Sequence, residues 1–390
     1  MSERRLRLGI AGLVRAFTLM LPSFLADQRV RLAAAADPRP EARAQFAADF
    51  AAPAYATVAE LCDAAGLDAI YIATPHQFHA EQACLAAAAG KHVLVEKPMA
   101  LTLADCARMI EAARAARVRL IVGPSHSFDE PIRHTNALIR SGAVGAVRMI
   151  TALNFTDFLY RPRRPEELDT KTGGGVFFNQ APHQVDIVRL LGGGRVTSVR
   201  SVAGAWDRTR PTEGAYSALL TFASGTTASL TYSGYAHFDS DEWCDGIGED
   251  GAPKDPASYG AARRRLAGAT GSEAERAERE RRGYGSGAGA TQRRNAFHEH
   301  FGAIIVSCEQ ADLRPTPTGV WIYGDDEKRF ETLPPPTVPR AAVIDELCAA
   351  ILEDRTPLHD GAWGLATMEV CLAMLQSAHE AREIAFVHQG

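Results

Sequence analysis

The chain has 390 residues, of which 46% are hydrophobic and 23% are charged, and its formal net charge is -5. This length suits two domains with separate cores, and the composition is that of a globular protein rather than a disordered chain. The negative balance argues against a nucleic-acid partner, because no general positive field would hold a polyanion. We expect no membrane partner either, because no apolar run reaches the roughly 20 residues of a membrane-spanning helix.

The number and spacing of the cysteines indicate the cellular compartment of the protein. There are seven, which is an odd number, and they are widely spaced without a Cys-x-x-Cys pair. This pattern favours reduced thiols in a cytosol and argues against a structural zinc site. The start of the chain is arginine-rich, but Arg15 interrupts its apolar run, so we expect no signal peptide and a cytoplasmic protein.

The first third of the chain alternates short apolar strands with helices. Strands are expected at residues 6–10, 30–36, 69–73, 92–95 and 120–122. Thr57 and Glu60 have the spacing of a capping box that opens a short helix. Continuous apolar strands separated by helices are typical of a doubly wound parallel sheet, which has helices on both faces. The sequence therefore predicts a Rossmann dinucleotide-binding domain over residues 1–123.

In such a domain, the turn after the first strand holds a pyrophosphate and an acid after the second strand binds the ribose. Gly12, Leu13 and Val14 form that turn, and Asp37 is the acid. The glycine fingerprint is incomplete, because Val14 and Phe17 stand at its second and third glycine positions. By itself, the segment reads equally well as a strand–helix turn without a ligand. If a dinucleotide binds, Asp37 would repel a ribose phosphate and favour NAD over NADP.

Later segments carry a specific resemblance. Residues 74–81 read Thr-Pro-His-x-x-His-x-Glu, residues 96–98 read Glu-Lys-Pro, and residues 173–175 are three glycines followed by His183 and Asp186. Together they resemble the glucose-fructose oxidoreductase and inositol dehydrogenase family, written Gfo/Idh/MocA, over most of the chain and in the right order. The resemblance implies a Rossmann domain and then an α/β domain whose open, mainly antiparallel sheet commonly forms oligomer contacts.

The resemblance also implies the site. The further side chains expected at the cofactor are Thr74, Pro75, His79, Glu96 and Lys97. Lys97 and His183 are implied to lie beside the nicotinamide, one as the base and the other as its orienting partner. The alternatives are a solvated strand-end lysine and a hydrogen-bonded core histidine. Asn179 replaces the family's usual aspartate and cannot take a proton, while Asp186 can orient His183 or be a structural carboxylate.

The pattern changes after residue 123, so a substrate-binding and oligomerisation domain is expected over residues 124–390. Strands are expected at 147–155, 219–222, 226–232 and 320–323, with helices at 341–353 and 362–381. Residues 252–296 are rich in Arg, Ala, Glu and Gly and read as an insertion. This insertion is either a solvated helix with glycine-rich ends or a lid or oligomer arm.

Residues 235–242, 357–364 and 179–184 resemble the phthalate 4,5-cis-dihydrodiol dehydrogenase branch of the family. That branch implies NAD-dependent oxidation of a ring cis-diol, of phthalate 4,5-dihydrodiol type, to a catechol. The substrate would be anionic, and a solvated loop is the alternative for the arginines that could bind its carboxylates. These candidate ligands are Arg161, Arg163 and Arg164.

Two other functions fit the sequence. One is a sugar or cyclitol dehydrogenase of the same family, and the other is a non-catalytic ligand sensor whose cofactor binding Val14 has weakened. His298 and His300 could join Asp239, Asp241 and Glu242 around a metal, but hydride transfer needs none and no metal site is expected. A small-molecule substrate and a homo-oligomer, dimer or tetramer, complete the expected partners.

Overall fold

The computed structural model describes residues 5–268, 271–281, 283–285, 296–386 and 389. The chain divides into two compact units, which are interleaved in sequence. The first takes in residues 1–124, 277–293 and 338–368, and the second takes in residues 125–276, 294–337 and 369–390. Two segments of the expected second domain, 277–293 and 338–368, therefore belong to the first unit.

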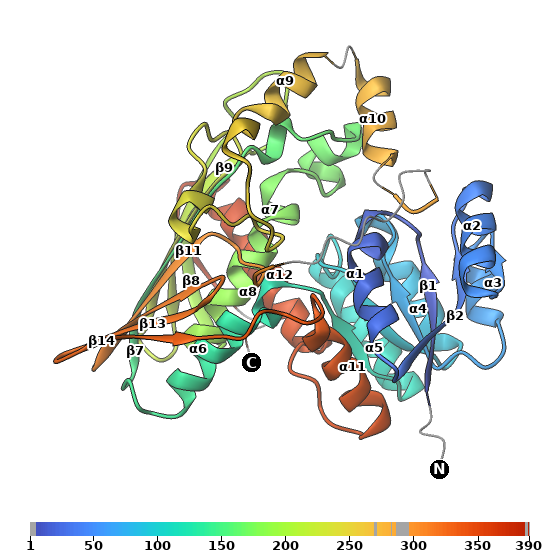
Figure 1. Cartoon of the computed structure of the whole chain (residues 1–390), viewed down its shortest axis with the longest axis horizontal. Helices are drawn as coiled ribbons and strands as arrows, with labels where there is room; N and C mark the ends of the chain where they lie inside the picture. Colours follow the sequence, from blue (N-terminus) through green and yellow to red (C-terminus); the bar gives the residue numbers. More distant parts are fainter. Residues whose placement is uncertain (1–4, 269–270, 282, 286–295, 387–388, 390) are drawn as a thin grey trace. The chain divides into compact units, whose positions relative to one another are not determined.

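The first unit is built on a six-stranded parallel sheet with the strand order β3-β2-β1-β4-β5-β6. Figure 1 labels β1 and β2 of this sheet and the helices beside them. The strands are β1 (Leu6–Ala11), β2 (Val30–Ala36), β3 (Ala54–Tyr55), β4 (Ala69–Ile72), β5 (His92–Val95) and β6 (Leu120–Val122). All of β4 is buried, as helices on both faces require. The strand order reverses between β1 and β4, and ligands bind outside the carboxyl ends of strands at such a switch point.

The helices of this unit are α1 (Arg15–Ala26), α2 (Pro40–Phe50), α3 (Val58–Asp63), α4 (His79–Ala88), α5 (Leu103–Ala116) and α11 (Ala341–Leu352). The capping box is confirmed at the start of α3. The Thr57 hydroxyl accepts the Glu60 N–H at 3.3 Å, and the Glu60 carboxylate accepts the Thr57 N–H at 2.9 Å. These bonds satisfy amides of the first helical turn, which have no partner within the helix.

The second unit is built on a nine-stranded sheet with the order β14-β13-β12-β11-β7-β10-β9-β8-β15. The strands are β7 (Val147–Phe155), β8 (Val196–Gly204), β9 (Ala215–Phe222), β10 (Thr227–Ser233), β11 (Ala303–Cys308), β12 (Ala311–Thr316), β13 (Gly319–Gly324), β14 (Lys328–Thr332) and β15 (Ile384–Ala385). Neighbouring strands are antiparallel except β7 and β10. The predicted doubly wound sheet and the predicted mainly antiparallel sheet are both confirmed.

The helices around this sheet are α6 (Glu130–Arg140), α7 (Gly175–Asn179), α8 (Ala181–Gly192) and α12 (Gly361–Glu380), the last of which begins in the first unit. α8 packs on β7 and β10, the parallel pair at the centre of the sheet. None of the helices that the structure describes is long and apolar enough to cross a membrane.

One face of the nine-stranded sheet exposes apolar side chains. Met149, Val202, Leu219 and Ile305 are 49%, 57%, 52% and 45% exposed. The strand register places all four on the same face, whereas Leu220, the neighbour of Leu219, is fully buried on the other. This face of the sheet therefore leaves four large apolar side chains exposed in the single chain.

The described part of the insertion is largely helical. It contains α9 (Ala261–Gly268) and α10 (Ser272–Glu280), while residues 269–270, 282 and 286–295 lie outside the described residues. Glu275 of α10 is buried in the second unit, where it accepts hydrogen bonds from the Arg210 guanidinium at 2.8 Å and the Arg163 N–H at 2.7 Å. The insertion is therefore held to the second unit by a buried ion pair as well as by its covalent connection.

Candidate active site

Gly12 closes the turn between β1 and α1. Its φ of +92° lies in the left-handed region, and a Cβ there would lie 3.0 Å from the Thr74 backbone nitrogen. Only glycine meets both constraints without strain. α1 begins with no acidic residue in its first turn and no side-chain cap from Val14, so neither offsets the positive end of the helix dipole. The turn therefore suits a pyrophosphate.

The missing second glycine does not strain the backbone. Val14 has φ -95° and ψ -169°, an extended conformation that any residue adopts. At the third glycine position, the Phe17 ring is fully buried and lies 6.3 Å from the Phe46 ring of α2. Val14 therefore differs from the glycine of the fingerprint in the volume of its side chain, whereas its backbone conformation is an ordinary one.

Asp37 ends β2 and is 2% exposed. Its Oδ2 accepts the Leu13 N–H at 2.8 Å, and its Oδ1 accepts the backbone N–H and Nε of Arg39, each at 2.9 Å. Arg39 Nη2 also donates to the Leu13 carbonyl oxygen at 2.7 Å. The carboxylate thus lies at the end of β2, where the sequence predicts the ribose acceptor, and its oxygens are bonded to Leu13 and Arg39.

His79 links the two loops that follow β4 and β5. The ring is buried, with Nε2 2.9 Å from the Thr74 carbonyl oxygen and Nδ1 2.9 Å from the Pro98 carbonyl oxygen. Burial lowers the pKa of His79, although both carbonyls favour the charged ring. The ring therefore lies between the loop that begins at Thr74 and the loop that carries Lys97, and it contacts a carbonyl oxygen of each.

Glu96 and Lys97 follow β5 directly and differ in environment. Glu96 is 8% exposed and accepts the Tyr71 hydroxyl of β4 at 2.5 Å. Burial raises the pKa of Glu96, although the Tyr71 hydrogen bond and the Lys97 charge oppose this. Lys97 is half-buried at the carboxyl edge of the sheet. The first unit thus brings Gly12, Thr74 and Lys97 to ends of β1, β4 and β5, its central strands.

His183 lies against a second histidine that sequence reasoning missed. The rings of His126 and His183 are 4.7 Å apart, and the Phe301 ring lies 5.1 and 5.0 Å from them. His126 Nδ1 lies 2.7 Å from Asp129 Oδ2. Burial opposes protonation of His126, but nearby carboxylates, chiefly Asp129, outweigh it and raise its pKa. A proton on His126 therefore places a positive charge beside the His183 ring.

Asn179 and Asp186 make hydrogen bonds of their own in the second unit. The Asn179 side-chain amide donates to the Gly175 carbonyl at 2.8 Å, across the short helix α7. The Asp186 carboxylate is buried and accepts the Ser127 hydroxyl at 2.5 Å. Their roles toward a substrate or His183 stay predictions.

Arg161 pairs with two carboxylates. Its Nε lies 2.9 Å from Asp157 Oδ1, and its Nη1 lies 3.3 Å from Glu249 Oε2. Glu249 also accepts the Asn154 side-chain amide at 3.2 Å. Burial alone would raise the pKa of Glu249, but Arg161 and His126 outweigh it and lower the pKa to about 2. Arg161 therefore belongs to the same charge cluster as His126.

The other two candidate arginines are held by neighbouring residues. The Arg163 guanidinium lies 3.6 Å from the centroid of the Phe158 ring, and Arg163 is only 7% exposed. Arg164 Nε lies 3.3 Å from carboxylate oxygens of both Glu166 and Glu167. Binding of a substrate by either would require these contacts to be exchanged, so their predicted role stays untested.

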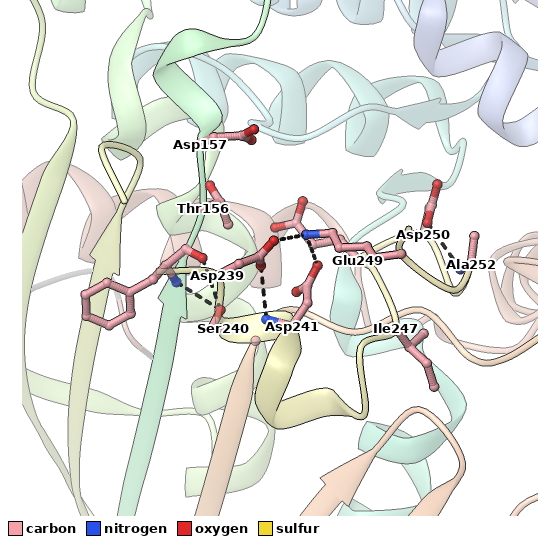
Figure 2. Close-up of polar contacts among 12 residues, drawn as sticks. Thr156, Asp157, Asp239, Ser240, Asp241, Ile247, Glu249, Asp250 and Ala252 are labelled. Carbon is pink, nitrogen blue, oxygen red and sulfur yellow. Dashed lines mark hydrogen bonds and ion pairs between the residues drawn. The ribbon is translucent and has the colours of Figure 1, made fainter. Parts of the chain in front are cut away.

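Two of the residues that could have bound a metal, Asp239 and Asp241, form ion pairs with a lysine side chain. Figure 2 shows the carboxylates of Asp239 and Asp241 directed at one nitrogen, which is Nζ of Lys254. His300 Nε2 lies 2.9 Å from the Ile247 carbonyl oxygen, and His298 Nε2 lies 2.9 Å from that of Pro334. The lysine supplies the cation that the two aspartates need.

Another group has a spacing that a metal ion tolerates. One ligand atom each from His126, Asp129 and Glu299 lie within 4.8 Å of one another. The ion pair of His126 with Asp129 accounts for two of these three residues without a metal.

Comparison with known proteins identifies the class. Residues 6–124 match the family model for the oxidoreductase family with an NAD-binding Rossmann fold, and residues 132–253 match the Gfo/Idh/MocA C-terminal domain. The chain belongs to the Gfo/Idh/MocA oxidoreductase family. Its first unit is an NAD-binding Rossmann domain, in agreement with the fit of the turn at Gly12 and the acid at Asp37.

Individual relatives show which members of the family this chain resembles. The chain is 48% identical over 374 residues, 95% of its length and 94% of the other, to 1-carboxy-3-chloro-3,4-dihydroxycyclohexa-1,5-diene dehydrogenase of Comamonas testosteroni. It superposes with TM-score 0.92 and 43% identity on a crystal structure from Bordetella bronchiseptica RB50 assigned as a dehydrogenase, over 98% of this chain and 100% of that one. The WlbA dehydrogenase of Bordetella pertussis, in complex with NADH and UDP-GlcNAcA, shares the fold with TM-score 0.69 and 23% identity, over 98% and 99% of the two chains.

We predict that Asp241→Asn changes the pH dependence of stability. Burial, aided by the charge of Glu249, raises the pKa of Asp241 to about 6 from 3.8. A raised folded-state pKa stabilises the fold at low pH, and this contribution is lost as the pH rises through about 6. The wild type should lose at most about 3 kcal/mol from this group between about pH 4 and about pH 7, and the variant should not.

Urea unfolding of both proteins at several pH values in this window measures the difference. Asp239→Asn is the matched control, because it removes the other, more exposed carboxylate from Lys254. Parallel stability profiles for wild type and Asp241→Asn would contradict the prediction.

Proposed function

We propose that this enzyme oxidises a cis-diol on a carboxylated, partly saturated ring and releases a catechol. Hydride leaves a ring carbon and its hydroxyl proton goes to a base, and the resulting hydroxydienone tautomerises to the aromatic product. The observation that carries the proposal is the 48% identity, over nearly the whole of both chains, to a dehydrogenase named for a carboxylated dihydroxycyclohexadiene. A phthalate 4,5-dihydrodiol, giving 4,5-dihydroxyphthalate, is our specific candidate.

The cofactor-binding residues follow from the first unit. When bound, NAD supplies the hydride acceptor. The turn of Gly12, Leu13 and Val14 holds the pyrophosphate on backbone amides, and Asp37 holds the ribose. The buried Asp37 carboxylate would repel a ribose phosphate, so NAD is preferred over NADP.

Two side chains are proposed for proton transfer. Lys97 is half-buried at the carboxyl end of β5, and its amine is the first proposed partner for the hydroxyl proton. His183, whose ring lies 4.7 Å from that of His126, is the second proposed partner for the proton. Arg161, in the same cluster as His126, is the arginine that we propose for the substrate carboxylate.

The assembly and compartment are also proposals. The exposed apolar face formed by Met149, Val202, Leu219 and Ile305 supports a homo-oligomer that buries this surface. All seven cysteines are free thiols, which supports a reducing cytosol as the working compartment.

The function is tested by following NADH formation with purified protein and a substrate panel. The panel holds a carboxylated ring cis-dihydrodiol, the same diol without its carboxylate, myo-inositol and glucose. We expect kcat/KM for the carboxylated diol to exceed the others by about 100-fold or more, because a site built to bind a charged group discriminates strongly. Turnover of only the sugar or cyclitol would overturn the substrate, and no turnover of any would favour a ligand sensor.

We predict that Lys97→Ala lowers kcat by about 100-fold or more, because the variant lacks a group for proton transfer. NAD affinity should stay within a few-fold, since Gly12 and Asp37 bind other parts of the dinucleotide. Steady-state kinetics and calorimetric titration measure the two quantities. Lys91→Ala is the control, because Lys91 lies at the amino end of the same strand, where its Nζ donates to the Leu67 carbonyl at 3.1 Å. Near-normal turnover by Lys97→Ala would refute the role.

We predict that His126→Gln moves the acidic limb of the kcat/KM profile to higher pH. His126 carries a positive charge when protonated and its ring lies 4.7 Å from that of His183, so its removal should make a proton on His183 less unfavourable. The midpoint of the acidic limb, compared between the two proteins, measures the shift. His379→Gln, at an exposed histidine of α12, is the control. An unmoved acidic limb would show that His183 is not the group that must be neutral.

A further inference from the structure

A short segment of the insertion packs on the dinucleotide-binding turn. The Tyr284 N–H donates to the Leu13 carbonyl oxygen at 3.1 Å, within the first unit. Gly285 has φ +78°, and a Cβ there would lie 2.7 Å from Cα of Ala42, so the segment runs directly against the backbone of α2. The described residues 283–285 are thus seated on the first unit by backbone contacts.

The Tyr284 ring completes an aromatic cluster. It meets the Phe17 ring edge-on at 5.3 Å and stacks on the Phe50 ring at 6.4 Å, and Tyr284 is only 6% exposed. Its hydroxyl donates to the Asp49 carboxylate. Phe17 stands at the third glycine position of the fingerprint. The insertion therefore packs on one of the two residues by which the turn departs from that pattern.

Both backbone polar groups of Leu13, its N–H and its carbonyl, form hydrogen bonds. Its N–H donates to Asp37, and its carbonyl accepts both Arg39 Nη2 at 2.7 Å and the Tyr284 N–H at 3.1 Å. Arg39 also occupies oxygens of Asp37 that a ribose would use. A ribose that binds Asp37 must therefore displace Arg39, at least in part. Tyr284 then keeps the Leu13 carbonyl satisfied, which avoids leaving a buried acceptor without a donor.

We propose that Tyr284 is a positioning residue for NAD. Its ring anchors the segment on Phe17 and Phe50, and its N–H holds the Leu13 carbonyl while Arg39 makes room at Asp37. The insertion then serves cofactor binding through this tyrosine. The inference rests on NAD binding by the first unit and is independent of which diol or sugar is oxidised.

Calorimetric titration of the full-length protein with NAD tests the proposal. We expect Tyr284→Ala to weaken NAD binding by roughly five- to tenfold, the loss that follows from one misplaced hydrogen bond. Tyr284→Phe keeps the ring and should stay within about twofold of the wild type on the same scale. Tyr259→Ala is the matched control, because Tyr259 lies in the same insertion and is 66% exposed.

Gly285→Ala tests the segment without removing an aromatic ring. The added Cβ would meet the backbone of Ala42, which displaces the segment, so NAD binding should weaken as in Tyr284→Ala. Thermal unfolding without NAD identifies folded variants, and the rise in Tm at saturating NAD gives a second readout. Folded Tyr284→Ala and Gly285→Ala that both bind NAD within twofold of the wild type would overturn the proposal. Equal weakening by Tyr259→Ala would also overturn it, because the effect would then not be specific to the segment.

Discussion

The buried imidazole of His79 holds together the loops on which the chemistry of the first unit depends. Parallel strands bring β4 and β5 to one edge, but the sheet bonds end before Thr74 and Lys97. The ring lies 2.9 Å from carbonyls on both loops and so continues the connection beyond the strands. Burial lowers the pKa of His79, whereas the two carbonyl oxygens favour the charged ring. The loop that carries Lys97 is thus held by a buried ring rather than by the sheet alone.

The second unit differs from the first because it buries several charged side chains, some of them near His126. A buried charge is tolerated only when it is paired, and Glu249 is paired with Arg161 while Asp241 is paired with Lys254. His126 receives its compensation from Asp129. The result is a local field that favours charge on His126, directly beside the His183 ring. If His183 is the base that we propose, the pairing of these charges bears on its chemistry.

The sequence indicated most of the first unit because its signals are local. Continuous apolar runs marked its main strands, and the Thr57–Glu60 spacing marked a helix start. β8 and β12 were missed because their burial alternates irregularly along polar sequences, and β12 contains Pro315. His126 was missed for a different reason. Its ring neighbour Phe301 and the carboxylate of Glu249 are distant in sequence, so only the fold brings them to the histidine. The chief cause of its raised pKa, Asp129, lies only three residues away, and that spacing was the one local signal for this histidine.

The departures at Val14 and Phe17 show why a motif must be judged with its tertiary surroundings. A glycine can be required for a positive φ or for space, and Val14 needs no positive φ. At Phe17 the lost space is taken up by an aromatic cluster that includes Tyr284, nearly 270 residues later in the sequence. Conformation and packing therefore leave the dinucleotide-binding turn intact. An incomplete fingerprint is no argument for a lost cofactor when another segment of the same chain completes the packing.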